Sequence, residues 1–149
     1  MAVLTETLKI HSGMAHFRIL SKILAVSPDG MEAEAVLNGA PRFAGLEAMA
    51  QTAALHARRL LGFERHAFLL SVRRCQMPSM AVLSGRCRVA AVLRGRSNAA
   101  FSYQVAANGP GGEDFDGDLL IGTTAYDHRF RKEALKAHYQ RIWNRLRQA

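Results

Sequence analysis

The stretch from Gly45 to Gly62, GLEAMAQTAALHARRLLG, constrains the fold most, because alanine recurs along nearly all of it. Alanine combines the highest helix propensity with little bulk, so this stretch predicts a helix that other backbone can approach closely. Glu47 and Gln51 lie four residues apart and therefore project from one face of that helix. A carboxylate in such a helix must form an ion pair, be exposed to solvent or take part in the function of the protein. Glu47 is therefore the first candidate functional residue. An apolar surface follows roughly helical spacing at Leu46, Met49, Ala53, Leu60 and Leu61.

Length and composition predict one globular domain spanning residues 1–149. Hydrophobic residues make up 49% and charged residues 21% of the 149 residues, which is ordinary for a soluble domain. No apolar run approaches the roughly 20 residues of a membrane span, and the first residues lack a signal-peptide pattern. Cys75 and Cys87 are too few for a disulfide framework and lack metal-site spacing. We therefore expect a cytoplasmic protein without a membrane span, a metal or a cofactor.

The net charge of +8 is the most unusual global property of the chain. It indicates either a solvated basic surface or an acidic partner. The chain has no nucleic-acid-binding motif and no exposed aromatics interleaved with its basic residues, so we expect no nucleic acid partner. The charge is concentrated in Arg58/Arg59, Arg73/Arg74, the segment 86–96 and the last twenty residues.

Alternating apolar residues and turn signals predict strands on both sides of the alanine-rich helix. A mixed apolar segment, 16–26, ends at the turn Ser27–Gly30, and Asn38–Pro41 is expected to break the next strand before the helix. After Gly62 the pattern predicts strands only, with a turn at residues 94–98 and a loop at residues 109–112. The last strand is apolar enough to lie in the middle of a sheet. The predicted strands are Met31–Leu37, Ala67–Met77, Leu83–Leu93, Ala99–Ala107 and Asp118–Tyr126.

The last segment predicts an amphipathic basic helix packed on the domain. Its apolar residues fall near helical spacing at Phe130, Leu135, Tyr139, Ile142, Trp143 and Leu146. Attachment to a membrane surface is the alternative for such a helix. Short connections between consecutive strands imply a mostly antiparallel sheet, whose apolar face the long helix must cover. The expected fold is thus an α+β domain in which a curved antiparallel sheet wraps around one long central helix.

Three segments, in this order, resemble the hotdog-fold 3-hydroxyacyl-[acyl-carrier-protein] dehydratases. FRILSKI (Phe17–Ile23) is similar to the first-strand segment of that family, LEAMAQTAALHA (Leu46–Ala57) to its central helix, and AFLLSVRRCQMP (Ala67–Pro78) to the strand that follows. A closer resemblance is to the short dehydratase-like subunits encoded in aryl-polyene-type lipid gene clusters, where a Gly-hydrophobe-Glu run opens the helix as Gly45-Leu46-Glu47 does. The resemblance implies a hotdog fold and a homodimer whose sheets join edge to edge.

The resemblance also implies a chemistry. Dehydration of a 3-hydroxyacyl thioester needs a base for the C2 proton and an acid for the leaving hydroxyl. Glu47 would be the carboxylate, Gln51 its orienting partner, and the backbone from Arg42 to Gly45 would face the thioester carbonyl as a helix start. An acidic acyl carrier protein would bind the basic residues, with Arg58, Arg59, Arg73 and Arg74 as candidates.

Two features depart from the family pattern. The family carries a histidine in a loop fourteen residues before its glutamate, whereas Ala33 stands at that position here. The Pro-Gly that opens the family's helix is Pro41-Arg42 in this chain. His11 and His16 are the candidate replacements for the missing imidazole, whereas His56 lies two and a half turns from Glu47 and is expected to point elsewhere.

Three functions follow as alternatives. The first is a 3-hydroxyacyl-acyl-carrier-protein dehydratase, and the second is an acyl thioesterase, which can use a lone helix carboxylate on an acyl-carrier-protein or acyl-CoA substrate. The third is a catalytically silent hotdog subunit that forms a heteromer with an active dehydratase. Glu47 could also be structural, held by strand backbone or by an arginine.

Overall fold

The computed structural model describes residues 19–77, 82–109, 111 and 114–149. The described residues form two strands, a helix, four strands and a final helix, in the order that the sequence predicts. The elements are β1 (Leu20–Ser27), β2 (Gly30–Pro41), α2 (Phe43–Leu60), β3 (His66–Gln76), β4 (Val82–Arg96), β5 (Ala100–Asn108), β6 (Asp114–Thr124) and α3 (Lys132–Gln148).

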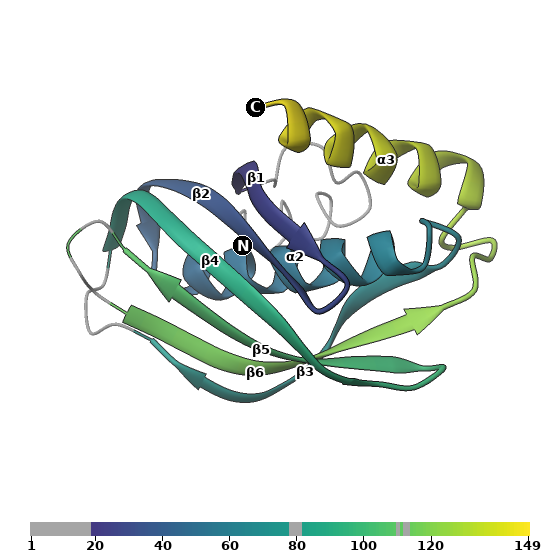
Figure 1. The fold of residues 1–149 in the computed structure, drawn as a ribbon, viewed down its shortest axis with the longest axis horizontal. Helices are drawn as coiled ribbons and strands as arrows, with labels where there is room; N and C mark the ends of the chain where they lie inside the picture. The colour runs from purple at the N-terminus through teal and green to yellow at the C-terminus, as the bar shows by residue number, and fades with distance from the viewer. Residues whose placement is uncertain (1–18, 78–81, 110, 112–113) are drawn as a thin grey trace.

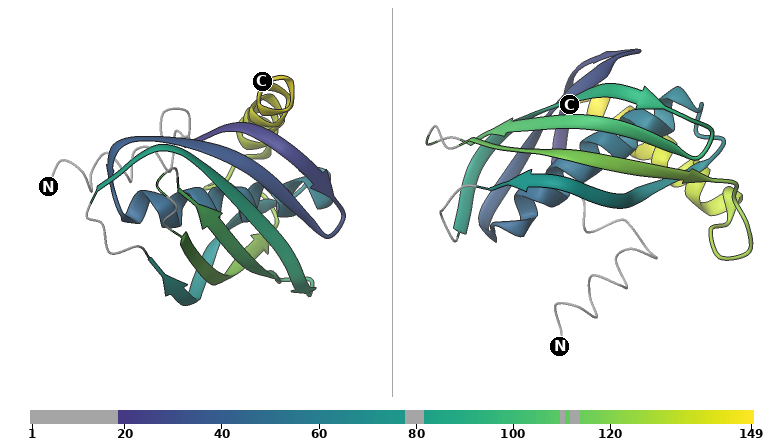
Figure 2. Two further views of the ribbon diagram at one scale, coloured as in Figure 1. Left: turned by 60° about the vertical axis from the view of Figure 1, so that its left-hand side comes forward. Right: turned by 90° about the horizontal axis from the view of Figure 1, so that it is seen from below.

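The six strands form one antiparallel sheet in the order β1-β2-β4-β5-β6-β3. The sheet curves around α2, which contacts all six strands (Figures 1 and 2). α3 lies on the side of α2 that the sheet leaves open and also contacts β1 (Figure 1). These features confirm the expected α+β arrangement, including the interior position of the last strand and the packing of the C-terminal helix on the domain.

The predicted break at Asn38–Pro41 is wrong, because β2 runs through it to Pro41. The strand accommodates these residues as an irregularity in its pairing with β4, between Leu37 and Ala40. Gly39 adopts a φ of 60° there, and its N–H donates to the hydroxyl oxygen of Ser84 over 2.8 Å. A glycine that can take a positive φ thus allows a bulge within the strand, where the sequence indicated the end of the strand.

The other boundaries differ from the predictions by a few residues. β4 continues to Arg96, so only the end of the predicted turn at 94–98 is a turn. β6 begins four residues before the predicted Asp118. α2 starts at Phe43 and ends before Gly62, whose φ of 62° is the left-handed conformation that commonly follows a helix.

The core lies between α2 and the concave face of the sheet. Alternate residues of β5 face it, and Phe101, Tyr103 and Val105 are all buried, as their spacing predicts. The helix contributes mostly small side chains to this face, including Ala48, Ala53 and Ala57, which lets the strands approach closely. Within the residues described, no helix is long and apolar enough to cross a membrane.

Candidate active site

Three polar side chains follow one stripe of α2. Gln51 is four residues and Arg58 eleven residues after Glu47, so all three project within about 40° of each other around the helix axis. The opposite side of the helix, with Met49, is buried against the sheet. The stripe therefore faces the side of α2 on which α3 lies.

Gln51 connects Glu47 to the start of β1. Its side-chain amide nitrogen donates to Oε1 of Glu47 over 3.1 Å, and its amide oxygen accepts the backbone N–H of Ile19 over 3.1 Å. The amide is therefore oriented by the backbone on one side and orients the carboxylate on the other. The four-residue spacing predicted this pair, but the contact with Ile19 comes from the fold alone.

Glu47 is half-buried and is not locked in an ion pair within the described chain. No lysine or arginine nitrogen described here lies within ion-pair distance of its carboxylate, and the five ion pairs there involve other acids. One amide hydrogen bond leaves a carboxylate with most of its acceptor capacity. Among the described residues, the arrangement differs from a structural Glu–Arg pair and suits a group that acts on a ligand or a water molecule.

Arg42 and Gly45, the two candidates at the start of α2, differ in their exposure to solvent. Arg42 is exposed just before the helix and makes no side-chain capping hydrogen bond. Gly45 is buried, and a Cβ built on it would lie 2.8 Å from the ring of Phe115. Close packing against β6 thus accounts for a glycine at this position, and the part it could take in substrate binding is limited to its backbone.

The structure leaves the two candidate imidazoles untested and shows how His56 is used. His11 and His16 lie outside the described residues. His56 points away from the Glu47 face, as expected, and contacts the sheet: its Nε2–H donates to the carbonyl oxygen of Ser27 over 2.8 Å, and its Nδ1 accepts the hydroxyl of Tyr103 over 2.7 Å. Burial lowers the pKa of His56, and the hydrogen bond to Ser27 partly opposes this. His56 is therefore a neutral core residue, and sequence reasoning missed its pairing with Tyr103 because that pairing depends on the sheet register.

Arg58 is wrong as a partner-binding residue, because the fold buries it. Only 2% of it is exposed. Its Nη2 donates to the carbonyl oxygen of Ala67 over 2.7 Å and to Nδ1 of His66 over 2.9 Å, while its guanidinium lies 3.5 Å from the ring centroid of Tyr139. Burial lowers the pKa of Arg58. This arginine joins α2, β3 and α3 and cannot reach another protein's surface.

The other three arginine candidates are exposed but not equivalent. Arg74 binds Asp116 over 2.6 Å and Asp118 over 3.1 Å, so its charge is compensated locally. Arg59 and Arg73 form no ion pair with a described carboxylate. Of the four candidates, these two remain available for an acidic partner.

Sequence reasoning assigned Tyr139 to packing and missed its position near the polar stripe. Burial raises the pKa of its hydroxyl, Arg58 opposes this, and the Glu47 carboxylate adds to the increase. Tyr139 is therefore a protonated phenol within the electrostatic reach of Glu47. Its place in an amphipathic helix gave no sign of this, because the sequence does not say which part of α2 that helix covers.

No protein-family model and no curated protein matches this sequence. Solved structures do match the fold. A thioesterase of Haemophilus influenzae is 16% identical and matches with a TM-score of 0.56 over 71% of this chain and 80% of its own. The dehydratase heterocomplex ApeI:P of Xenorhabdus doucetiae matches at 13% identity and a TM-score of 0.62, over 76% of this chain and 86% of that one. A mutant thioesterase of Pseudomonas aeruginosa matches at 10% identity and a TM-score of 0.60, over 80% and 91%.

The similarity to these structures lies in the architecture. The matched proteins share a sheet that curves around a helix, and they cover most of this chain. The chain therefore has the hotdog fold found in these thioesterases and dehydratases.

Proposed function

We propose that this protein hydrolyses acyl thioesters and that Glu47 is its general base. The observation that carries the proposal is the Glu47 carboxylate itself, which is half-buried, oriented by Gln51 and without an ion-pair partner in the described chain. Thioesterases among the solved structures with this fold support the substrate class.

Hydrolysis requires little more than such a carboxylate. Glu47 would take a proton from a water molecule, whose oxygen attacks the thioester carbonyl. The C–S bond then breaks, and the sulfur leaves as a thiol after taking up that proton. The backbone N–H groups at the start of α2, near Arg42, would stabilise the negative charge on the carbonyl oxygen.

Dehydration of a 3-hydroxyacyl thioester is the second candidate. It needs a second acid–base group in addition to Glu47, for which His11 and His16 are the candidates. The match to a dehydratase heterocomplex favours this candidate, and it equally favours a silent subunit that works only within a heteromer.

Assays with 3-hydroxyacyl and saturated acyl thioesters, on both CoA and acyl carrier protein, test the proposal. Hydrolysis releases a free thiol from either acyl type, whereas dehydration produces an enoyl absorbance from the 3-hydroxyacyl type alone. We expect thiol release that Glu47→Gln lowers by about a hundredfold or more, within the usual contribution of a general base. Glu133→Gln, at an exposed carboxylate in the first turn of α3, is the matched control. Undiminished hydrolysis by Glu47→Gln would show that Glu47 is structural.

We also propose that a second hotdog subunit pairs along β3. This strand is an edge of the sheet, and Leu69, Leu70 and Val72 on it are exposed. An apolar edge with unpaired backbone groups can extend a sheet into a second copy or a related chain. The chain has only two cysteines, which is too few for a disulfide framework and suits a reducing compartment such as the cytoplasm. Arg59 and Arg73 would attract an acidic carrier protein.

A further inference from the structure

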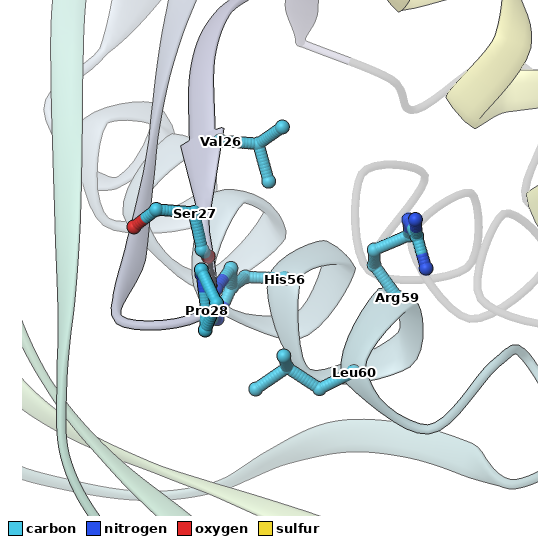
Figure 3. Close-up of a pocket in the computed structure, with 6 residues that line it drawn as sticks. All are labelled: Val26, Ser27, Pro28, His56, Arg59 and Leu60. Atoms are coloured by element: carbon cyan, nitrogen blue, oxygen red, sulfur yellow. Dashed lines mark hydrogen bonds between the residues drawn. The ribbon is translucent and has the colours of Figure 1, made fainter.

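A cavity of about 320 Å³ lies at the C-terminal end of α2, far from Glu47. The end of β1 and the turn after it line one side through Val26, Ser27 and Pro28, and the last turns of α2 line the other through His56, Arg59 and Leu60 (Figure 3). Arg59 is twelve residues from Glu47, which corresponds to about 18 Å along the helix. The cavity is therefore separate from the candidate active site, and its volume is at the lower end of the usual range for small-molecule pockets, about 300–1,000 Å³.

The lining is apolar apart from a few polar groups at its edge. Val26, Pro28 and Leu60 contribute hydrocarbon surface. Both ring nitrogens of His56 are hydrogen-bonded within the protein, to Ser27 and to Tyr103. The Ser27 hydroxyl accepts the N–H of Asp29 over 3.2 Å. Such a lining favours a ligand with an apolar part.

The arginines at this end of the molecule favour a ligand that also has an anionic group. The guanidinium of Arg59 lies 5.7 Å from the ring centroid of Trp143 in α3, and that of Arg147 lies 5.9 Å from the same ring. Neither forms an ion pair with a carboxylate in the described chain. Phe63 holds the indole edge-on, with the ring centroids 6.1 Å apart. Two guanidinium groups on one anchored ring, without a carboxylate partner among the described residues, form a local excess of positive charge near the cavity.

One acidic residue opposes this charge. Asp29 follows Pro28 in the exposed turn, and its carboxylate is close enough to raise the pKa of His56 against the larger lowering effect of burial. The Asp29 carboxylate therefore reduces the affinity of the cavity for an anion without forming an ion pair with Arg59. Asp29 also offers a substitution with a predictable sign, since its removal should strengthen the binding of an anion.

We propose that this cavity binds an amphipathic anion, with an alkyl chain against Val26, Pro28 and Leu60 and a carboxylate or phosphate head on Arg59. A guanidinium binds either head group through charge-assisted hydrogen bonds and is more weakly hydrated than an ammonium group, which suits a partly apolar site. A free fatty acid and an alkyl phosphate share this chemistry, and they are distinguished by experiment.

Trp143 is the only tryptophan of the chain, so its fluorescence reports directly on the neighbourhood of Arg59. Titrations of the full chain with butyrate, hexanoate, octanoate and decanoate should give saturable changes. Affinity should rise about three- to fourfold for each added CH₂ group until the cavity is full. Decyl phosphate identifies the preferred head group, and decanol, which lacks a charge, should bind at least about tenfold more weakly than decanoate.

Substitutions test the two parts of the site separately. Arg59→Gln should weaken decanoate binding about tenfold or more, whereas Arg88→Gln, an exposed arginine on β4, should leave it unchanged. Asp29→Asn should strengthen it, and Val26→Phe should remove the dependence on chain length by filling the cavity. Circular dichroism verifies that each variant is folded. Equal binding of decanoate by the wild type and Arg59→Gln, or equal binding of decanoate and decanol, would overturn the proposal.

Discussion

The side-chain amide of Gln51 donates a hydrogen bond to Oε1 of Glu47 over 3.1 Å, one helical turn away. The opposite end of the same amide is held by the backbone N–H of Ile19. The carboxylate is thus oriented by a group that is itself fixed at the edge of the sheet. A general base must lie within hydrogen-bonding distance of the attacking water, and this orientation by Gln51 helps to fix the position of the carboxylate.

We expect Gln51→Leu to lower kcat for thioester hydrolysis about tenfold, with a smaller effect on KM. A hydrogen bond to a charged group contributes about 1.5–3 kcal/mol, and loss of the lower value corresponds to roughly that factor. Steady-state kinetics measure this effect, with Gln140→Leu on the exposed surface of α3 as the control. An unchanged kcat in Gln51→Leu would mean that the amide has only a structural role.

Arg58 and Arg59 are neighbours in sequence with opposite environments, and their substitutions should differ accordingly. Arg58→Ala removes the buried donor to the Ala67 carbonyl and the packing under Tyr139, so the free energy of unfolding should fall by about 3 kcal/mol. Arg59→Ala should change it by less than about 0.5 kcal/mol, as is usual at an exposed position.

Urea unfolding followed by circular dichroism measures both values. Arg58→Met, which keeps the volume but removes the buried charge, separates packing from electrostatics and should cost less than Arg58→Ala. Similar losses in the Arg58→Ala and Arg59→Ala variants would contradict the burial described here.

The stability of the protein should decrease as the pH falls from about 6.5 to about 4. Burial, and then the charge of Arg58, lower the pKa of His66 from its ordinary value to about 4. In that window the unfolded chain binds a proton that the folded chain does not, so acid favours unfolding. The full effect of this residue is about 3 kcal/mol, reached below pH 4. Burial lowers the pKa of His56 as well, so this residue acts in the same direction.

Urea midpoints measured at pH 7, 6, 5 and 4.5 give the slope. His66→Gln removes the titrating group at that position and should flatten the pH dependence, even if it lowers stability at pH 7. The slope would stay at its wild-type value in His66→Gln if residues elsewhere caused the acid sensitivity.

The exposed apolar edge at β3 predicts a specific effect on assembly. Leu70 is 53% exposed on this edge strand, and a lysine there is a common protection against edge pairing. We expect a dimer by light scattering coupled to size-exclusion chromatography, and Leu70→Lys should raise its dissociation constant about tenfold or more. Val36→Lys is the matched control, because Val36 is 49% exposed but lies on β2, which has neighbours on both sides. A dimer unaffected by Leu70→Lys would place the interface elsewhere.

Much of the fold was predictable because the signals were local. The alanine-rich segment formed α2 and ended before Gly62, and alternation placed Phe101 and Tyr103 in the core. The main error was at Asn38–Pro41, where the Asn-Gly pair and the proline predicted the end of a strand, whereas Gly39 takes a positive φ within β2. Whether such a glycine ends a strand or forms a bulge depends on whether a neighbouring strand is present to continue the pairing, and in this protein β4 supplies it.

The sequence by itself determined the pairing of Glu47 with Gln51, because helical spacing brings residues four apart into contact whatever surrounds them. Only the tertiary structure decided that Arg58 is buried while Arg59 is exposed, that His56 is bonded to Tyr103, and that Trp143 lies beside Arg59. These relationships join α2 to distant strands and to α3, and they depend on sheet register and on where the last helix docks. Neither is encoded in the spacing of residues along one element, so charge and propensity alone could not assign them.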